Sequence, residues 1–180
     1  MIPDGELAQR WLAGDRTALA ELFCRYERAL FGYLLRMLGH SHDAEEALQD
    51  TFVSAINGRG SYEERGKFRA WLFRIAHNEA LRVIRSRTRH PQGPHGMDGL
   101  RDDAPDPEED LMRAEACRRV EQAIASLPDA EREVVLLRHY SGMLFREIAD
   151  VLEAPLGTVL SRHHTAARRL SKRLSDLKEE

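Results

Sequence analysis

The chain has 180 residues, of which 42% are hydrophobic and 32% charged, and its formal net charge is −3 at pH 7. This length allows one domain or two small ones. No segment approaches the run of about eighteen apolar residues that spans a bilayer, and the first residues lack the charged and then apolar layout of a signal peptide. The composition therefore excludes a membrane-spanning protein, and we expect a cytoplasmic protein with no direct membrane insertion.

Residues 1–90 are predicted to be helical throughout. Apolar residues recur at helical spacing over 19–38 and again over 44–56. Gly39 ends the first pattern, and Ile56 is the last residue on the apolar face of the second. The following Gly-rich residues 57–61 predict a loop. A third helical pattern comes after this loop and runs into a cluster of arginines.

A Pro- and Gly-rich acidic segment interrupts the helical pattern at residues 91–110, which contain four prolines and three glycines. Such a segment buries little apolar surface and is typical of a flexible linker. Helical spacing resumes near Leu111, so we place the linker at residues 91–112.

The segment from Gly142 to Leu170 predicts two short helices joined by a tight turn at residues 153–155. The second helix buries Val159, Ala166 and Leu170, and its other face presents polar and basic residues three and four apart. This pattern favours a helix-turn-helix that reads a major groove over an ordinary helical hairpin. The predicted fold is therefore all-α, with two small helical domains joined by a flexible acidic linker and a helix-turn-helix in the C-terminal one.

Charge is segregated along the chain. Residues 82–89 form a basic run and residues 162–173 contain no acid, whereas residues 98–115 and 43–50 are acidic. Such segregation indicates two basic surfaces for nucleic acid and an acidic surface for a different partner.

Cys24 and Cys117 are far apart and belong to no CxxC pattern, so two small core residues are a better interpretation than a disulfide or a metal site. The pair His163 and His164 has no third ligand nearby. We expect no metal and no cofactor.

Three motifs, in this order, resemble the extracytoplasmic-function (ECF) group of bacterial RNA polymerase sigma factors. They are DAEEALQDTF at 43–52, FRAWLFRIAHN at 68–78, and EIA at 147–149 followed by PLGTVLSR at 155–162. The resemblance implies two domains with separate tasks. Residues 1–90 would be sigma region 2, which binds core polymerase and recognises and melts the −10 element, and residues 113–180 would be sigma region 4, which reads the −35 element as duplex.

The resemblance implies a −10 contact set on the loop and helix that follow residue 56. Tyr62 stands where the family has an aromatic beside a flipped base, and Asn78 stands where an amide hydrogen-bonds a base edge. Basic residues would follow the backbone of the strand and supply salt-dependent affinity. Trp71 lies on the apolar face and is assigned to the core. The −10 set is Tyr62, Lys67, Arg69, Arg74, Asn78, Arg82 and Arg85.

The −35 set lies on the helix-turn-helix. Arg162 or Arg168 would read guanine, and the start of the second helix would hold a phosphate through its backbone N–H groups. The set is Arg146, Gly157, Thr158, Ser161, Arg162, His164, Thr165, Arg168, Arg169 and Lys172. Leu160, His163 and Thr165 depart from the usual family pattern, which predicts an unusual −35 preference.

The remaining partners also follow from the resemblance. The acidic helix would bind a coiled coil of the largest polymerase subunit through Asp43, Glu45, Glu46, Gln49, Asp50 and Phe52, with the polymerase flap as a second contact. An anti-sigma factor, often membrane-bound, would hold the protein inactive. No small-molecule substrate is expected.

Two other classes of function are weaker. An autonomous helix-turn-helix regulator that binds operator DNA as a dimer would leave the motifs at 43–52 and 68–78 unexplained. An enzyme is not expected, because the sequence has no clustered catalytic triad, P-loop, plausible carboxylate pair or HExxH motif.

Overall fold

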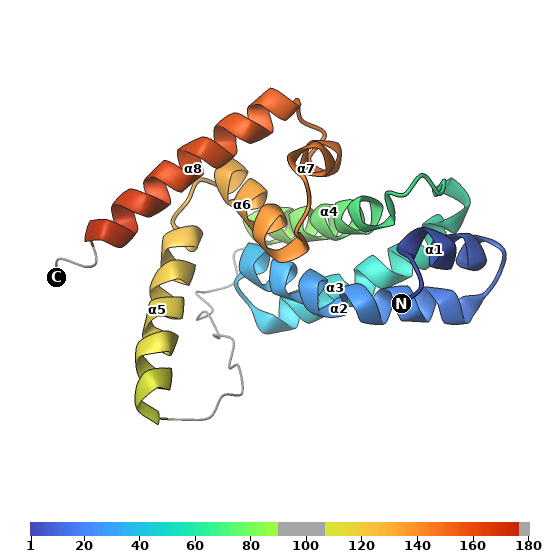
Figure 1. The fold of residues 1–180 in the computed structure, drawn as a ribbon, viewed down its shortest axis with the longest axis horizontal. Helices are drawn as coiled ribbons and strands as arrows, with labels where there is room; N and C mark the ends of the chain where they lie inside the picture. Colours follow the sequence, from blue (N-terminus) through green and yellow to red (C-terminus); the bar gives the residue numbers. More distant parts are fainter. Residues whose placement is uncertain (90–106, 177–180) are drawn as a thin grey trace.

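The structure is a computed structural model that describes residues 1–89 and 107–176, and every regular element within these ranges is a helix (Figure 1). The N-terminal half comprises α1 (Asp4–Leu12), α2 (Arg16–Leu38), α3 (Ser41–Asn57), a 3₁₀ helix (Gly58–Ser61) and α4 (Phe68–Arg89). The C-terminal half comprises α5 (Pro107–Ala125), α6 (Asp129–Ser141), α7 (Phe145–Val151) and α8 (Leu156–Asp176). The all-α prediction is confirmed.

Local sequence signals set the ends of the central helix α2. The Asp15 side chain accepts hydrogen bonds from the backbone N–H groups of Thr17 (2.9 Å) and Ala18 (3.3 Å), which caps the first turn. Gly39 ends the helix with a φ of 77°, a left-handed conformation that glycine adopts without steric cost. The predicted stop at Gly39 and the restart at Ser41 are therefore confirmed.

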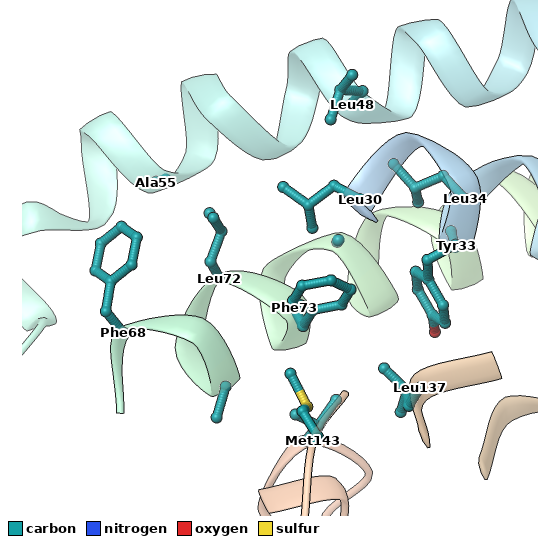
Figure 2. Packing of buried hydrophobic residues seen from close by; sticks show 14 of the residues in the cluster. Leu30, Tyr33, Leu34, Leu48, Ala55, Phe68, Leu72, Phe73, Leu137 and Met143 are labelled. Atoms are coloured by element: carbon teal, nitrogen blue, oxygen red, sulfur yellow. The ribbon is translucent and has the colours of Figure 1, made fainter. Parts of the chain in front are cut away.

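The core of the N-terminal half lies between α2, α3 and α4. Leu30, Leu34 and Leu72 are completely buried there, and Tyr33 meets Phe73 edge to face with ring centroids 5.8 Å apart. Figure 2 shows these side chains of α2 and α4 beneath Leu48 and Ala55 of α3. Burial of this apolar surface is the main source of the stability of the bundle.

The two halves share this core. Helix α6 packs against α2, and α7 packs against α4. Leu137 and Met143 of the C-terminal half are completely buried. In Figure 2 they lie beneath Tyr33 and Phe73, on the side away from α3. Gly32 lies against Tyr140 in this contact, and a Cβ atom added at Gly32 would make an ordinary van der Waals contact with that ring at 3.5 Å.

Several expectations about boundaries change. Helix α5 begins at Pro107, so residues 107–112 of the predicted linker are helical, and its other residues lie outside the described ranges. Proline at the first helical position and acids behind it are favourable helix starts. Residues 58–61 form a 3₁₀ helix and not an irregular loop. Among the described residues, no helix is both long and apolar enough to cross a membrane.

Candidate nucleic-acid interface

The turn between α7 and α8 has the geometry of a helix-turn-helix. Glu153 takes a left-handed φ of 49°, and the N–H of Ala154 donates to the carbonyl of Ala149 at 3.1 Å, so the chain turns sharply at the end of α7. The carbonyl of Pro155 then accepts hydrogen bonds from the N–H groups of Thr158 and Val159 and starts α8. Pro155 therefore lies immediately before the helix, one position earlier than predicted.

One face of α8 is open. Val159 and Ala166 are completely buried and Leu170 is half-buried, as predicted. The opposite face exposes Gly157, Ser161, His164, Arg168 and Lys172, and Leu160 stands beside it with 44% of its surface exposed. A helix with this exposed row has the length and polarity needed to enter a major groove.

Other members of the predicted −35 set contact the rest of the C-terminal half. Thr158, Arg162 and Thr165 are half-buried at the edges of the exposed row. Burial raises the pKa of the Glu133 carboxyl, and the nearby charge of Arg162 opposes that rise. Arg169 is ion-paired with Glu131 at 3.2 Å. Arg162 and Arg169 thus also stabilise the packing of α8 on α6.

The two histidines of α8 differ in position. The ring of His163 packs edge to face on Phe145 with centroids 4.8 Å apart, whereas His164 is exposed. This matches the expectation that one packs and the other points outward. No group of three potential metal ligands was found among residues 1–89 and 107–176.

A second exposed row runs along α4. Arg74, Asn78, Arg82 and Arg85 are all exposed at helical spacing, so a single strand could follow their common face. Arg82 is already ion-paired with Asp50 and with Glu79. Arg74, Asn78 and Arg85 form no ion pair or side-chain hydrogen bond with the part of the chain that the structure describes.

Tyr62 does not lie on this surface. It is only 6% exposed, and its ring packs among Trp11, Phe68 and Trp71 with centroids 4.7–5.9 Å away. Its hydroxyl donates to Glu64 at 2.6 Å. In this conformation the Tyr62 ring therefore belongs to the apolar packing and is not exposed, and the assignment of Trp71 to the same packing agrees with the contacts.

The N-terminal end of the predicted −10 set is covered by the C-terminal half. Arg69 is bonded to Glu147, with one guanidinium nitrogen 2.9 Å from each carboxylate oxygen, and Lys67 is paired with Asp150 at 2.7 Å. Both acids lie on α7, the first helix of the helix-turn-helix. These contacts could not be predicted from spacing within the sequence, because they join residues about 80 positions apart.

The acidic residues of α3 fall into two groups. Asp43 is ion-paired with Arg87, and Asp50 with Arg82, so both hold α3 against α4. Glu45, Glu46 and Gln49 are exposed, and the carboxylate of Glu46 lies 3.6 Å from Nε2 of His42 on the same helix. Phe52 is half-buried and stacks on Phe23 with centroids 4.1 Å apart. Only part of the predicted polymerase-binding set is therefore free on the surface.

Sequence reasoning missed two apolar residues of the same helix. Val53 is 54% exposed, and Ile56, which was assigned to the apolar side, is 51% exposed. Both continue the exposed row that passes through Glu46 and Gln49 at three- and four-residue spacing. Acidic residues that run into an apolar end suit a partner with both basic and apolar character.

Cys24 and Cys117 are both free and exposed, which corrects their assignment to the core. Cys24 lies on α2 and Cys117 on α5. The helical periods placed both near apolar neighbours, but spacing alone does not say which flank of an apolar stripe is covered by another helix.

Two family profiles match the chain. The profile described as Sigma-70 region 2 matches residues 22–90, and the profile described as Sigma-70, region 4 matches residues 117–170. The exposed row of α4 lies in the first match and the helix-turn-helix lies in the second.

Similar proteins extend over nearly the whole chain. ECF RNA polymerase sigma factor SigW of Bacillus subtilis is 32% identical over 91% of this chain and 92% of its own length, and ECF RNA polymerase sigma factor SigM of Mycobacterium tuberculosis is 33% identical over 97% and 86%. Among solved structures, CnrH in complex with the cytosolic domain of CnrY is 27% identical, with a TM-score of 0.75 over 97% of this chain and 99% of that one. The sigma factor RpoE in complex with the anti-sigma factor NepR from Bartonella quintana is 26% identical, with a TM-score of 0.73 over 87% and 96%.

Proposed function

The chain belongs to the ECF group of bacterial RNA polymerase sigma factors, and from this premise we propose that its two exposed rows divide promoter recognition between them. It is a transcription initiation factor that binds core RNA polymerase and directs it to promoters through their −10 and −35 elements. The proposal assigns region 2 to residues 1–90, a linker to residues 91–112 and region 4 to residues 113–180. The protein performs no reaction of its own in this scheme.

One observation carries the proposal. Two separate polar and basic rows are exposed, one on α4 within the region 2 match and one on α8 within the region 4 match. The row on α4 suits a melted strand, because Asn78 offers both a donor and an acceptor to a base edge and the arginines beside it attract phosphates. The row on α8 suits duplex DNA, because a helix fits the major groove.

Within the −10 row we propose different tasks for neighbouring residues. Asn78 selects a base, while Arg74, Arg82 and Arg85 bind the strand's backbone together with Lys67 and Arg69. In the −35 row, Ser161, His164 and Arg168 face base edges. Gly157, Thr158, Arg146 and Lys172 meet the phosphates, and Arg162, Thr165 and Arg169 stand at the flanks of the groove.

Core polymerase is proposed to dock on the exposed part of α3. Glu45, Glu46 and Gln49 supply the polar contacts with the coiled coil of the largest subunit, and Val53 and Ile56 extend the contact with apolar surface. Region 4 would meet the flap.

An anti-sigma factor is the proposed regulator. Both similar solved structures are complexes with a second protein, and in one of them that protein is an anti-sigma factor. The same exposed surfaces that serve polymerase and promoter would be the ones such a partner covers. A membrane-bound anti-sigma factor would tether the cytoplasmic protein at the membrane.

Transcription in vitro tests the proposal. A bacterial core polymerase is supplied with a promoter library, with and without this protein, and the transcripts are sequenced. Transcripts that depend on the protein and share spaced −35 and −10 motifs are expected. Their absence, together with tight binding of the protein alone to duplex DNA, would favour an autonomous regulator.

A variant pair separates the roles on α4. Asn78→Ala should change the preferred −10 sequence with little effect on the salt dependence of binding. Arg74→Ala should keep the sequence preference and reduce the slope of log affinity against log salt by about 0.7, the value for one phosphate contact on a single strand. Equal effects of the two variants would contradict this division of tasks.

A further inference from the structure

Two neighbouring arginines of α8 differ in what lies against them. Helix α6 packs along α8 (Figure 1), and its acid Glu131 is ion-paired with Arg169, with 3.2 Å between the Oε2 and Nε atoms. Arg168 directly precedes Arg169, is exposed, and has no ion pair with the part of the chain that the structure describes. Two identical side chains on one turn of the helix therefore have different charge environments.

The acid of this pair lies deeper than the base. Only 13% of the Glu131 side chain is exposed, compared with 58% of the Arg169 side chain. The Oε2 atom of Glu131 is buried and accepts no hydrogen bond from any described residue, so the charge of Arg169 compensates it without an aligned hydrogen bond. Removing the cation from such a carboxylate is costly, because no water or donor replaces it. Glu131 therefore acts as a tether for Arg169.

The tether restrains a side chain that binds DNA with little selectivity. Arginine is long, and its five N–H groups can bind any phosphate as well as the edge of guanine. Moving the Arg169 guanidinium from α6 onto DNA would leave the buried carboxylate of Glu131 without its cation. The ion pair therefore opposes new contacts between Arg169 and DNA of any sequence.

Discrimination between DNA sequences is a difference between two affinities. Cations that meet phosphates add to the affinity for every duplex, whatever its sequence. A carboxylate that withholds one arginine lowers this shared part of the affinity. It leaves the exposed row of Ser161, His164 and Arg168 unchanged, so base reading is retained.

We propose that Glu131 is a specificity-determining residue for the −35 element, which acts by positioning Arg169 on the flank of α8. It lowers binding to unrelated duplexes and leaves the reading of guanine to Arg168. The proposal rests on the −35 role given to α8 above, and it assigns part of the specificity to a helix that does not enter the groove.

Duplex binding by the full-length protein tests this assignment. Wild type first selects its preferred duplex from a randomised pool, and affinities for that duplex and for a scrambled one are then measured over a range of salt concentrations. On the scrambled duplex, Glu131→Gln should steepen the slope of log affinity against log salt by about 0.9, the value for one phosphate contact, and so raise the affinity about eightfold at 0.1 M salt.

The affinity for the selected duplex should rise less in the same variant. In that complex α8 is held in the groove, and the flank that carries Arg169 faces α6. The ratio of specific to unspecific affinity should therefore fall several-fold. Glu115→Gln is the matched control, because it removes a carboxylate that is ion-paired with Arg119 on α5 of the same half. Its slope and ratio should equal those of wild type.

A double variant shows whether Glu131 acts through Arg169. If it does, Glu131→Gln should have no effect on slope or ratio in a protein that already carries Arg169→Ala. A merely structural role of Glu131 would give the same change in both backgrounds. Repeating the selection with Arg168→Ala should remove a guanine preference, whereas Arg169→Ala should keep it.

Thermal unfolding verifies that the variants fold. Glu131→Asp withdraws the carboxylate by one methylene group and should change the slope in the same direction by less, so it supplies the test if Glu131→Gln does not fold.

The outcomes separate this proposal from the promoter role. If wild type selects a sequence and directs transcription with core polymerase, but Glu131→Gln changes neither slope nor ratio, the assignment of Glu131 is overturned and the promoter role stands. An effect of Glu131→Gln that persists with Arg169→Ala would also overturn it. A wild-type protein that selects no sequence would contradict the −35 role itself, and this proposal would fall with it.

Discussion

Tyr33 and His77 are joined by a buried hydrogen bond, with the tyrosine hydroxyl 2.9 Å from the Nδ1 atom of the imidazole, across 44 positions of sequence. Tyr33 is completely buried and His77 is 6% exposed. The bond links α2 to α4 at the place where Leu137 of α6 also packs (Figure 2). A polar contact thus lies within the apolar core that the two halves share.

This pair predicts a loss of stability in mild acid. Burial lowers the pKa of His77 to about 4, and the charge of Arg85 adds to that shift. The unfolded chain takes up the proton near pH 6.5, so between pH 6.5 and 4 unfolding binds a proton and stability falls as the pH falls. The full effect is up to about 3 kcal/mol.

Urea unfolding at several pH values checks this prediction. His77→Asn places an amide near the position of Nδ1 and does not titrate. Its free energy of unfolding should depend less steeply on pH than that of wild type between pH 7.5 and 5. Parallel curves for the two proteins would show that His77 is not the group responsible.

We expect a charged residue at the exposed apolar end of α3 to weaken binding to core polymerase. Val53→Glu should weaken binding to core polymerase by about tenfold or more, because a carboxylate would be buried against the apolar part of the partner. Its thermal stability should be unchanged, since Val53 is 54% exposed. Competition with a labelled sigma factor for core polymerase measures the change.

Ala20 offers a matched control for that substitution. It is exposed on α2, so Ala20→Glu introduces the same charge on a different helix of the same half. Core binding should be unaffected. Equal losses in both variants would mean that added negative charge, and not the position of Val53, is responsible.

We expect Leu160 to contact thymine methyl groups, so that these groups contribute to −35 recognition. It is an exposed leucine beside the groove-facing row of α8, and the methyl group of thymine is the apolar feature of the major groove. Replacing −35 thymines by deoxyuridine, one at a time, should weaken binding by about fourfold at one position, the value of about one buried methyl group. Leu160→Ala should bind both DNAs alike. A wild-type protein that does not distinguish them would remove Leu160 from the specificity set.

We expect the replacement of Glu153 by glycine to stabilise the folded protein. Its φ of 49° is costly for a residue with a Cβ atom, and it ends α7 where helices commonly carry glycine. Glu153→Gly should raise the free energy of unfolding by about 0.5–1 kcal/mol. Thermal unfolding compares it with Glu153→Gln, which keeps the strain and should match wild type. A lower melting temperature for Glu153→Gly than for Glu153→Gln would mean that contacts of the side chain hold the turn.

The helices themselves were predictable because their signals are local. Gly39 and the turn before Pro155 each act within a few residues, and the structure places helix ends at or next to both. The periods of buried residues in α2 and α8 follow from the same local rule.

The errors concern what covers each helix. Ile56 belongs to an apolar pattern, yet it is 51% exposed. Tyr62 follows a Gly-rich segment, yet its ring packs against Trp11 and Trp71. The contacts of Arg69 and Lys67 with α7 depend on how the two halves meet, which no spacing within either half encodes. For the same reason nothing in the sequence indicated that the two helical domains share a core.

The burial of Leu137 and Met143 between the halves has a further consequence for the lifetime of the free protein. Proteases and chaperones act on exposed apolar chain, and a closed molecule keeps these side chains out of their reach. Any separation of the halves would uncover them unless a partner took their place. Cellular abundance of the unbound protein is thereby tied to how firmly α6 stays packed on α2.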